Sequence, residues 1–167
     1  VERRYLTHLP GRVPDPARLT AFDLARSALT RLQARRAREL ARLDALIFVS
    51  TSNPNPCNSQ AALLAEACGL TASCLDIKAG CSSGVLGIAQ AALLIRAGCE
   101  RVLVVMAENL SQFTPPDDLR MLLTVGDVVG RSFFNKPKKP LIVTRGLFKS
   151  CETVYVNRSS SATCCSS

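Results

Sequence analysis

The stretch that decides the fold reads Leu75-Asp76-Ile77-Lys78-Ala79-Gly80-Cys81-Ser82-Ser83-Gly84. It begins inside a short segment, residues 73–77, whose composition is typical of a β-strand. It leads into residues 83–97, which are apolar on almost every side and end before Gly98. A helix of that kind has to be buried. The sequence therefore predicts a strand, a tight turn through a small residue, and a cysteine delivered to the start of a buried helix.

The same alternation extends to both sides of this stretch. Residues 17–43 have the apolar period of a helix, with arginines mostly on the other face, which we interpret as a solvated face. Strands are expected at residues 45–49 and 101–107, and a further helix at residues 61–68. Helices and strands that alternate at this spacing indicate βαβ units and an α/β fold with a mostly parallel sheet. Residues 1–16, with three prolines, are expected to form an entering loop.

The hydrophobic periodicity and the composition of the sequence change at about Val128. Beyond it no period is sustained, apart from one possible strand at residues 141–144, and Glu152 is the single acidic residue. We therefore divide the chain into residues 1–127, an α/β part with a buried helix, and residues 128–167. The second part is expected to be a basic irregular tail, either out of frame or disordered.

Charge and composition narrow the class of protein. The 167 residues carry a formal net charge of +8. Residues 1–130 hold 14 Lys and Arg against 12 Asp and Glu, so most of the excess lies in the tail and a nucleic-acid partner is not expected. The longest charge-free apolar stretch, residues 79–95, contains several polar residues and makes a poor membrane span. No signal peptide is visible, so a cytoplasmic location is expected, and the missing initial Met suggests a piece of a longer protein.

The eight cysteines include no C-x-x-C pair, and His8 is the single histidine. This pattern favours neither a Cys/His zinc site nor a disulfide scaffold. Cys81 differs from the others because it is expected at a helix N-terminus, which carries about half a unit of positive charge. Such a terminus favours the thiolate, and its N–H groups can hold the oxyanion formed when a thiolate attacks a thioester. From the residues alone, a buried structural cysteine remains the alternative.

The segment Ala79-Gly80-Cys81-Ser82-Ser83-Gly84 resembles the nucleophile segment of the thiolase-fold condensing enzymes, most closely that of β-ketoacyl-acyl-carrier-protein synthase III. Other segments resemble this family in the family's order. They are residues 1–4, the strand and turn at residues 43–52, residues 101–110 with Ala-Glu-Asn-Leu at their end, and residues 118–127. The likeness covers about residues 1–127, and several spaced motifs in order are more specific than the cysteine motif alone.

The resemblance implies the N-terminal half of a thiolase-like fold, with Cys81 as the acylated nucleophile. Gly80, Ser82 and Gly84 are then expected to support the oxyanion through the backbone, and Arg120 is a candidate contact of coenzyme A. The family transfers an acyl group from acyl-CoA to the cysteine and condenses it with malonyl-acyl carrier protein in fatty acid or polyketide biosynthesis. Acyl-CoA and acyl carrier protein are the implied partners, a homodimer is implied for the intact family, and no cofactor or metal is implied.

The sequence also departs from the family. The family's catalytic His and Asn, from its C-terminal half, match no residue here, and His8 lies in an unlike position. Leu119 stands where many members have the arginine that contacts coenzyme A, one place from Arg120. The chain is therefore expected to be inactive by itself. The alternatives are a thiolase, a hydroxymethylglutaryl-CoA synthase-like relative, or a non-catalytic interaction module with a basic tail.

Overall fold

The computed structural model describes residues 19–53, 57–115, 118, 120 and 126–136, and the backbone of residues 151–154. In chain order its elements are α1 (Ala21–Leu40), β1 (Ala45–Val49), α2 (Gln60–Ala67), β2 (Ser73–Ile77), the 3₁₀ turn η1 (Gly80–Ser82), α3 (Ser83–Ala97), β3 (Arg101–Asn109), the 3₁₀ turn η2 (Leu110–Phe113), β4 (Asp127–Asn135) and β5 (Cys151–Val154).

The strands form one sheet in the order β2-β1-β3-β4-β5. Strand β1 pairs in parallel with β2 on one side and with β3 on the other. Strand β4 joins β3 in antiparallel register, with Arg101 opposite Asn135 and Asn109 opposite Asp127, and β5 continues antiparallel to β4. The α/β fold with a parallel core is therefore confirmed, and antiparallel strands extend it on the β3 side.

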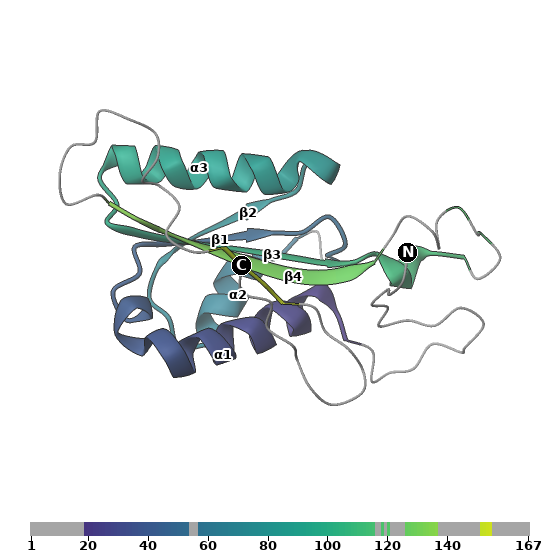
Figure 1. Ribbon diagram of the computed structural model, residues 1–167, viewed down its shortest axis with the longest axis horizontal. Helices are drawn as coiled ribbons and strands as arrows, with labels where there is room; N and C mark the ends of the chain where they lie inside the picture. The colour runs from purple at the N-terminus through teal and green to yellow at the C-terminus, as the bar shows by residue number, and fades with distance from the viewer. Residues whose placement is uncertain are drawn as a thin grey trace.

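Helices cover both faces of the sheet (Figure 1): α1 and α2 lie on one face and α3 lies on the other. Successive side chains of a strand point to opposite faces, so β1 supplies both layers. Leu46 and Phe48 belong to the core under α1 and α2, while Ile47 belongs to the core under α3. All five residues of β1 are buried, as expected for a central parallel strand.

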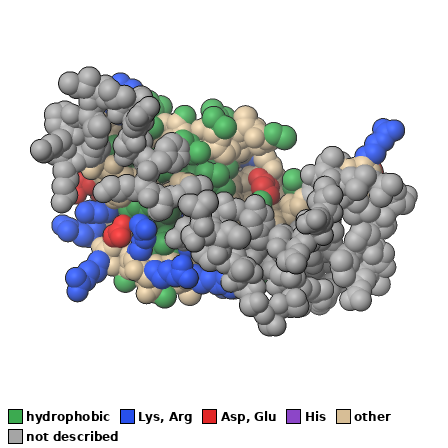
Figure 2. All heavy atoms as spheres, viewed as in Figure 1, with side chains coloured by type: hydrophobic (Ala, Val, Ile, Leu, Met, Phe, Trp, Pro, Cys, Tyr) green, Lys and Arg blue, Asp and Glu red, His purple; other side chains and the backbone are tan. Residues whose placement is uncertain are grey.

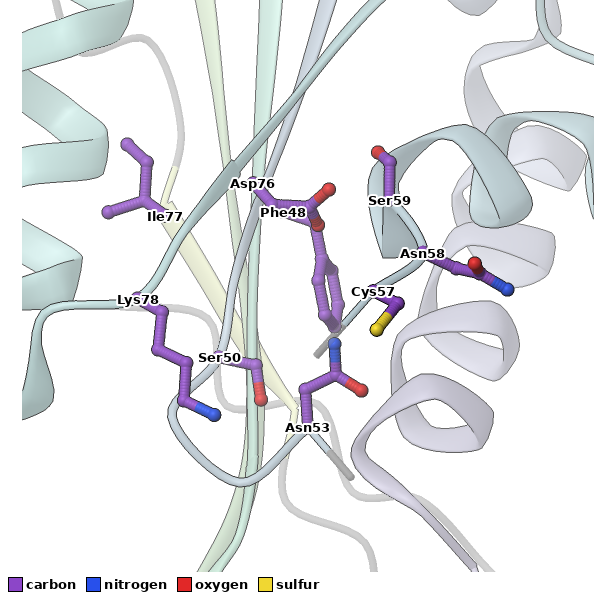
Figure 3. A pocket seen from close by; sticks show the side chains of 9 residues that line it. All are labelled: Phe48, Ser50, Asn53, Cys57, Asn58, Ser59, Asp76, Ile77 and Lys78. Carbon is purple, nitrogen blue, oxygen red and sulfur yellow. The ribbon is translucent and has the colours of Figure 1, made fainter. Parts of the chain in front are cut away.

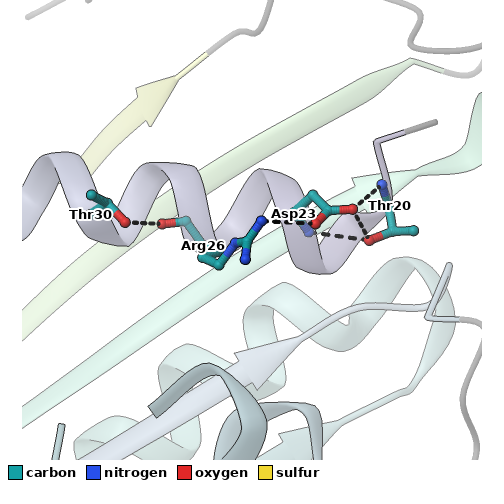
Figure 4. Close-up of polar contacts among 4 residues, drawn as sticks. All are labelled: Thr20, Asp23, Arg26 and Thr30. Atoms are coloured by element: carbon teal, nitrogen blue, oxygen red, sulfur yellow. Dashed lines mark hydrogen bonds and ion pairs between the residues drawn. The ribbon is translucent and has the colours of Figure 1, made fainter. Parts of the chain in front are cut away.

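Helix α1 has a defined start, shown in Figure 4. The Thr20 hydroxyl accepts a hydrogen bond from the Asp23 amide at 3.2 Å, and the Asp23 carboxylate accepts one from the Thr20 amide at 2.9 Å. This capping box satisfies two amides that a helix start leaves without partners. Within the helix, Arg36 has non-helical angles (φ −135°, ψ 38°), so the axis kinks there.

Helix α3 approaches the sheet closely at Gly87, where an added Cβ would lie 2.7 Å from Val49 Cγ2 and 3.3 Å from Val104 Cγ1. Ala91 and Ile95 pack in the same layer. Residues Gly80–Ala97 are long enough and apolar enough (mean hydropathy 1.3) to cross a membrane by length and composition alone. Core helices of globular proteins can have the same length and composition. The expectation that α3 is buried is wrong for its outer face, where Val85 is 70% exposed and Leu93 56% exposed.

The predicted boundary at residue 127 needs a correction. An irregular tail from residue 128 onward was expected, but residues 128–135 belong to β4, whose Val129, Phe133 and Phe134 are buried. The local sequence pattern of these residues does not predict a strand. The strand forms because β4 pairs with β3 along its whole length. The expected loop at residues 1–16 and the possible strand at residues 141–144 lie outside the described residues, and the rest of the tail prediction stays a prediction.

Candidate active site at Cys81

Cys81 is exposed and lies in η1, two residues before α3 begins. The sequence prediction that it stands between a strand and the start of the helix ending at Ala97 is confirmed. Gly80, just before it, has φ +58°, in the left-handed region that glycine adopts without strain. An added Cβ on Gly80 would meet nothing within 4 Å, so the backbone angle alone requires glycine there.

Two serine hydroxyls hold this turn. Ser83 is buried, and its Oγ accepts a hydrogen bond from the Ala79 amide at 2.6 Å and donates one to the Gly80 carbonyl at 2.7 Å. Ser82 Oγ donates to the Ala79 carbonyl at 2.8 Å. The turn that presents the cysteine is therefore fixed from both sides, which limits where the thiol can point.

The start of α3 has no side-chain cap, although the Ser83 amide is already used in a hydrogen bond to the Gly80 carbonyl. Ser82 stands at the N-cap position but makes no side-chain cap, because its hydroxyl is directed at Ala79 instead. Helix starts that lack a cap leave amide N–H groups for another acceptor. Ser82 is therefore not a helix cap, and the expected role of its backbone in oxyanion binding stays a prediction.

Gly84 marks where α3 meets β3. A Cβ added there would lie 3.4 Å from the sulfur of Met106, near the end of β3, which is an ordinary contact. The first turn of α3 thus lies against the carboxyl end of β3, and Cys81 belongs to the edge of the sheet where the parallel strands end. In open α/β sheets ligands bind outside this edge.

Glu108 organises the same edge, and sequence reasoning gave it no role. Its carboxylate accepts hydrogen bonds from the Thr51 amide (2.7 Å), the Thr51 hydroxyl (2.9 Å) and the Ser52 amide (3.0 Å). Asn109 adds a bond from its amide to Ser52 Oγ at 2.7 Å. The turn after β1 is therefore tied to the end of β3. The sequence signal that could have revealed this role was an acidic residue at the end of one strand together with a Thr-Ser turn at the end of the neighbouring strand.

Asp127 is buried at the start of β4. Its carboxylate accepts hydrogen bonds from the Ser111 amide at 3.0 Å and the Ser111 hydroxyl at 2.6 Å. This acid, which the sequence analysis placed only at the end of a family-like segment, anchors β4 to η2.

A cavity of about 370 Å³ opens beside the ends of β1 and β2 (Figure 3). Phe48 and Asp76 reach it from the strands, and Ser59, the N-cap of α2, borders it. Asp76 already accepts a hydrogen bond from the Ala61 amide at 3.0 Å, so the start of α2 holds a carboxylate of the chain itself. Cys81 does not line this cavity, which lies on the α2 side of the sheet.

The other described cysteines differ from Cys81 in their surroundings. Cys57 is exposed and lines the cavity, whereas Cys68, Cys74 and Cys99 are half-buried. Burial raises the pKa of the Cys68 thiol, and the positive charge of Arg26 opposes that shift. Burial also raises the pKa of Cys74, and the nearby Asp76 carboxylate adds to the effect. Both shifts favour the protonated thiol, which is the less reactive form.

The remaining predicted site residues are less informative. Arg120 is exposed, and its immediate neighbours in sequence are not described, so its use as a coenzyme A contact stays a prediction. His8 lies outside the described residues. Within the described part of the chain, no group of three or more His, Cys, Asp or Glu residues could hold a metal ion.

Comparisons with known proteins agree with this geometry. The family model of 3-oxoacyl-[acyl-carrier-protein] synthase III matches residues 75–140, a range that includes Cys81 and β4. The β-ketoacyl-[acyl-carrier-protein] synthase III of Geobacillus kaustophilus is 35% identical over 120 residues, which are 68% of this chain and 39% of that protein. A chloroplastic synthase III of Cuphea wrightii is 34% identical over 109 residues, 61% of this chain and 27% of that protein.

Solved structures give the same result. The synthase III of Thermus thermophilus superposes with a TM-score of 0.67 and 32% identity, covering 77% of this chain and 40% of that one. The Pseudomonas aeruginosa synthase III superposes with a TM-score of 0.66 and 26% identity, covering 80% and 40%. The chain thus spans about two fifths or less of the length of these relatives. Over the part that these comparisons match, the chain is similar to β-ketoacyl-[acyl-carrier-protein] synthase III and has the fold of these condensing enzymes.

Proposed function

We propose that Cys81 is the acyl-accepting nucleophile of a β-ketoacyl-[acyl-carrier-protein] synthase III-type acyltransferase. The observation that carries the proposal is the position of an exposed thiol directly before the uncapped start of α3, inside the segment that the family model matches. The names of the relatives favour this reaction over that of a thiolase or a hydroxymethylglutaryl-CoA synthase.

In the first step, the Cys81 thiolate attacks the thioester carbonyl of an acyl-CoA. A carbon–sulfur bond forms to Cys81, the bond to the sulfur of coenzyme A breaks, and coenzyme A leaves as a thiolate that takes up a proton. Backbone N–H groups at the start of α3 are the proposed donors to the oxyanion while it exists, since preorganised donors stabilise such a charge, and a glycine at position 80 puts no side chain beside Cys81.

In the second step, malonyl on an acyl carrier protein loses carbon dioxide, and the resulting carbanion attacks the acyl-Cys81 carbonyl. Cys81 leaves as a thiolate, and the product is a β-ketoacyl thioester on the carrier. The described residues near Cys81 include no histidine, so the 167-residue chain is proposed to acylate itself but not to condense. Acyl-CoA, the carrier protein, a homodimer and a location in the cytoplasm belong to this proposal.

Mass spectrometry of the 167-residue chain after incubation with a short acyl-CoA tests the first step. We expect the mass of one acyl group on the peptide that contains Cys81, and its loss in Cys81→Ala. Cys57→Ala is the matched control, because Cys57 is also exposed, and it should leave acylation intact. Acylation that depends on Cys57 instead, or none at Cys81, would overturn the nucleophile assignment.

A further inference from the structure

Helix α1 carries an unusual number of arginines, and only some have partners. Arg26 pairs with Asp23 at 3.5 Å (Figure 4), and Arg36 pairs with Glu39 at 3.5 Å. Four more arginines are exposed and form no ion pair with any residue that the structure describes: Arg31, Arg35, Arg38 and Arg42. We call these four the arginine face.

Three of these arginines share one side of α1. Arg31, Arg35 and Arg38 are spaced i, i+4 and i+7, which places side chains on one face of a helix, and Arg42 follows two residues after α1 ends. Leu29, Leu32 and Leu40 point the other way into the core. The kink at Arg36 lies between Arg35 and Arg38, all four arginines are exposed, and basic side chains gather over α1 in Figure 2. From Arg31 to Arg38 the face spans about 10 Å of helical rise.

The proposed reaction does not account for the arginine face. Helix α1 covers the face of the sheet opposite α3, and its C-terminal end leads into the start of β1 (Figure 1). Cys81 follows the end of β2, which is parallel to β1, so it belongs to the other edge of the sheet. The arginines nearest the end of α1 therefore lie away from Cys81 both across the sheet and along it.

We propose that the arginine face is a docking surface for a protein that presents a row of carboxylates. Like charges at i and i+4 destabilise a helix, and α1 has one such pair on this face, Arg31 with Arg35, with Arg38 one turn further on. Carboxylates of a partner would relieve that repulsion. Guanidinium groups bind carboxylates through two parallel hydrogen bonds, and an acidic helix laid along α1 would present carboxylates to Arg31, Arg35 and Arg38 and extend toward Arg42.

Two other partners fit less well. A helix that lies in a membrane surface inserts large apolar side chains, whereas the exposed neighbours of these arginines on α1 are Ala34, Ala37 and Ala41. A single-stranded nucleic acid would use aromatic residues for stacking, and the exposed surface of α1 has none.

Fluorescence polarisation with a synthetic helical peptide tests the proposal. The labelled peptide has Glu at four positions spaced like the arginines, and a matched peptide has Gln at the same positions. At low salt we expect the Glu peptide to bind the 167-residue chain and the Gln peptide not to bind. Arg35→Glu should weaken binding about fivefold or more, and the double variant with Arg38→Glu should abolish it.

Arg96→Glu is the control, because Arg96 is an exposed arginine of α3 and its reversal changes the net charge equally. It should change the affinity less than about twofold. Equal weakening by Arg96→Glu would overturn the proposal in favour of attraction by net charge alone. Absence of peptide binding at low salt, or preferential binding of a DNA duplex or of phosphatidylserine vesicles, would also overturn it. If a reversal variant loses its helical circular dichroism, Arg35→Gln decides the result.

Discussion

At the scale of single residues, the cysteines differ in their solvent exposure and in the pKa of their thiols. Cys81 and Cys57 are exposed, whereas burial raises the pKa values of Cys68 and Cys74. Alkylation needs the thiolate, so at mildly alkaline pH we expect iodoacetamide to modify Cys81 faster than Cys68, Cys74 or Cys99. Peptide mapping in a Cys57→Ser background measures the order without interference from the second exposed thiol. Faster modification of Cys68 or Cys99 in folded protein would contradict the assignment of Cys81.

Gly80 yields a second prediction at this scale. Its φ of +58° costs a residue with a Cβ about 1–2 kcal/mol, and no neighbour lies within 4 Å to add a clash. Gly80→Ala should therefore lower the free energy of unfolding by about that amount and slow alkylation of Cys81, because the turn shifts. Gly130→Ala is the matched control, since its Cβ also meets nothing within 4 Å but its φ is not positive. Denaturant unfolding of both variants measures the difference, and equal stability would contradict a strained requirement at Gly80.

At the scale of elements, the close approach of α3 to the sheet decides where Cys81 stands. An alanine Cβ at position 87 would lie 2.7 Å from Val49 Cγ2. The side chain of Val49 cannot move away from this contact, because it is short and buried. We expect Gly87→Ala to destabilise the fold by about 1–3 kcal/mol, even though alanine favours helices. The double variant with Val49→Ala should recover part of this loss, as a double-mutant cycle by chemical denaturation would show.

Gly84→Ala separates the clash from the change in helix propensity. Its Cβ would lie 3.4 Å from Met106, an ordinary contact, so the variant should be neutral or more stable. Equal destabilisation by Gly84→Ala and Gly87→Ala would show that the distance to Val49 does not set the position of α3.

Local sequence patterns predicted those helices and strands whose hydrophobic residues follow directly from burial in the core. The bounds expected for β1, β2 and α3 agree with the structure, and apolar runs mark β1 and α3 directly, the latter ending at Gly98. Strand β4 was missed because Asp127–Asn135 mixes glycine, arginine, serine and phenylalanine without a period, and its order comes from pairing with β3. The roles of Gly87 and Glu108 were also missed, because both depend on contacts between segments distant in the chain.

At the scale of the whole molecule, the sheet is covered unequally. Helices α1 and α2 bury their apolar residues well, while α3 leaves Val85, Leu86 and Leu93 in solvent. Apart from Arg96 in its last turn, α3 carries no charged residue that would keep this side hydrated. The polar and apolar faces of the molecule therefore differ in what they can bind: α1 offers charge, and α3 offers apolar area.

This asymmetry predicts that the 167-residue chain self-associates through α3. Each large side chain withdrawn from water contributes about 1.5–3 kcal/mol when fully buried, so the three exposed residues of α3 provide a substantial driving force. Sedimentation velocity should show species larger than a monomer whose fraction grows with concentration. Val85→Lys combined with Leu93→Lys should shift the distribution toward monomer without lowering the free energy of unfolding, since both side chains are already exposed.

Leu63→Lys is the control for that experiment, because Leu63 is 38% exposed on α2, across the sheet from α3. Combined with Ala67→Lys, at another exposed position of α2, it adds the same two positive charges, so an effect of net charge alone would reduce association in both variants. Selective loss of association in the α3 variant places the contact on that helix. A monodisperse monomer for the unmodified chain at all concentrations would mean that the outer face of α3 is stable in water as it stands, and that the apolar side chains there do not drive assembly.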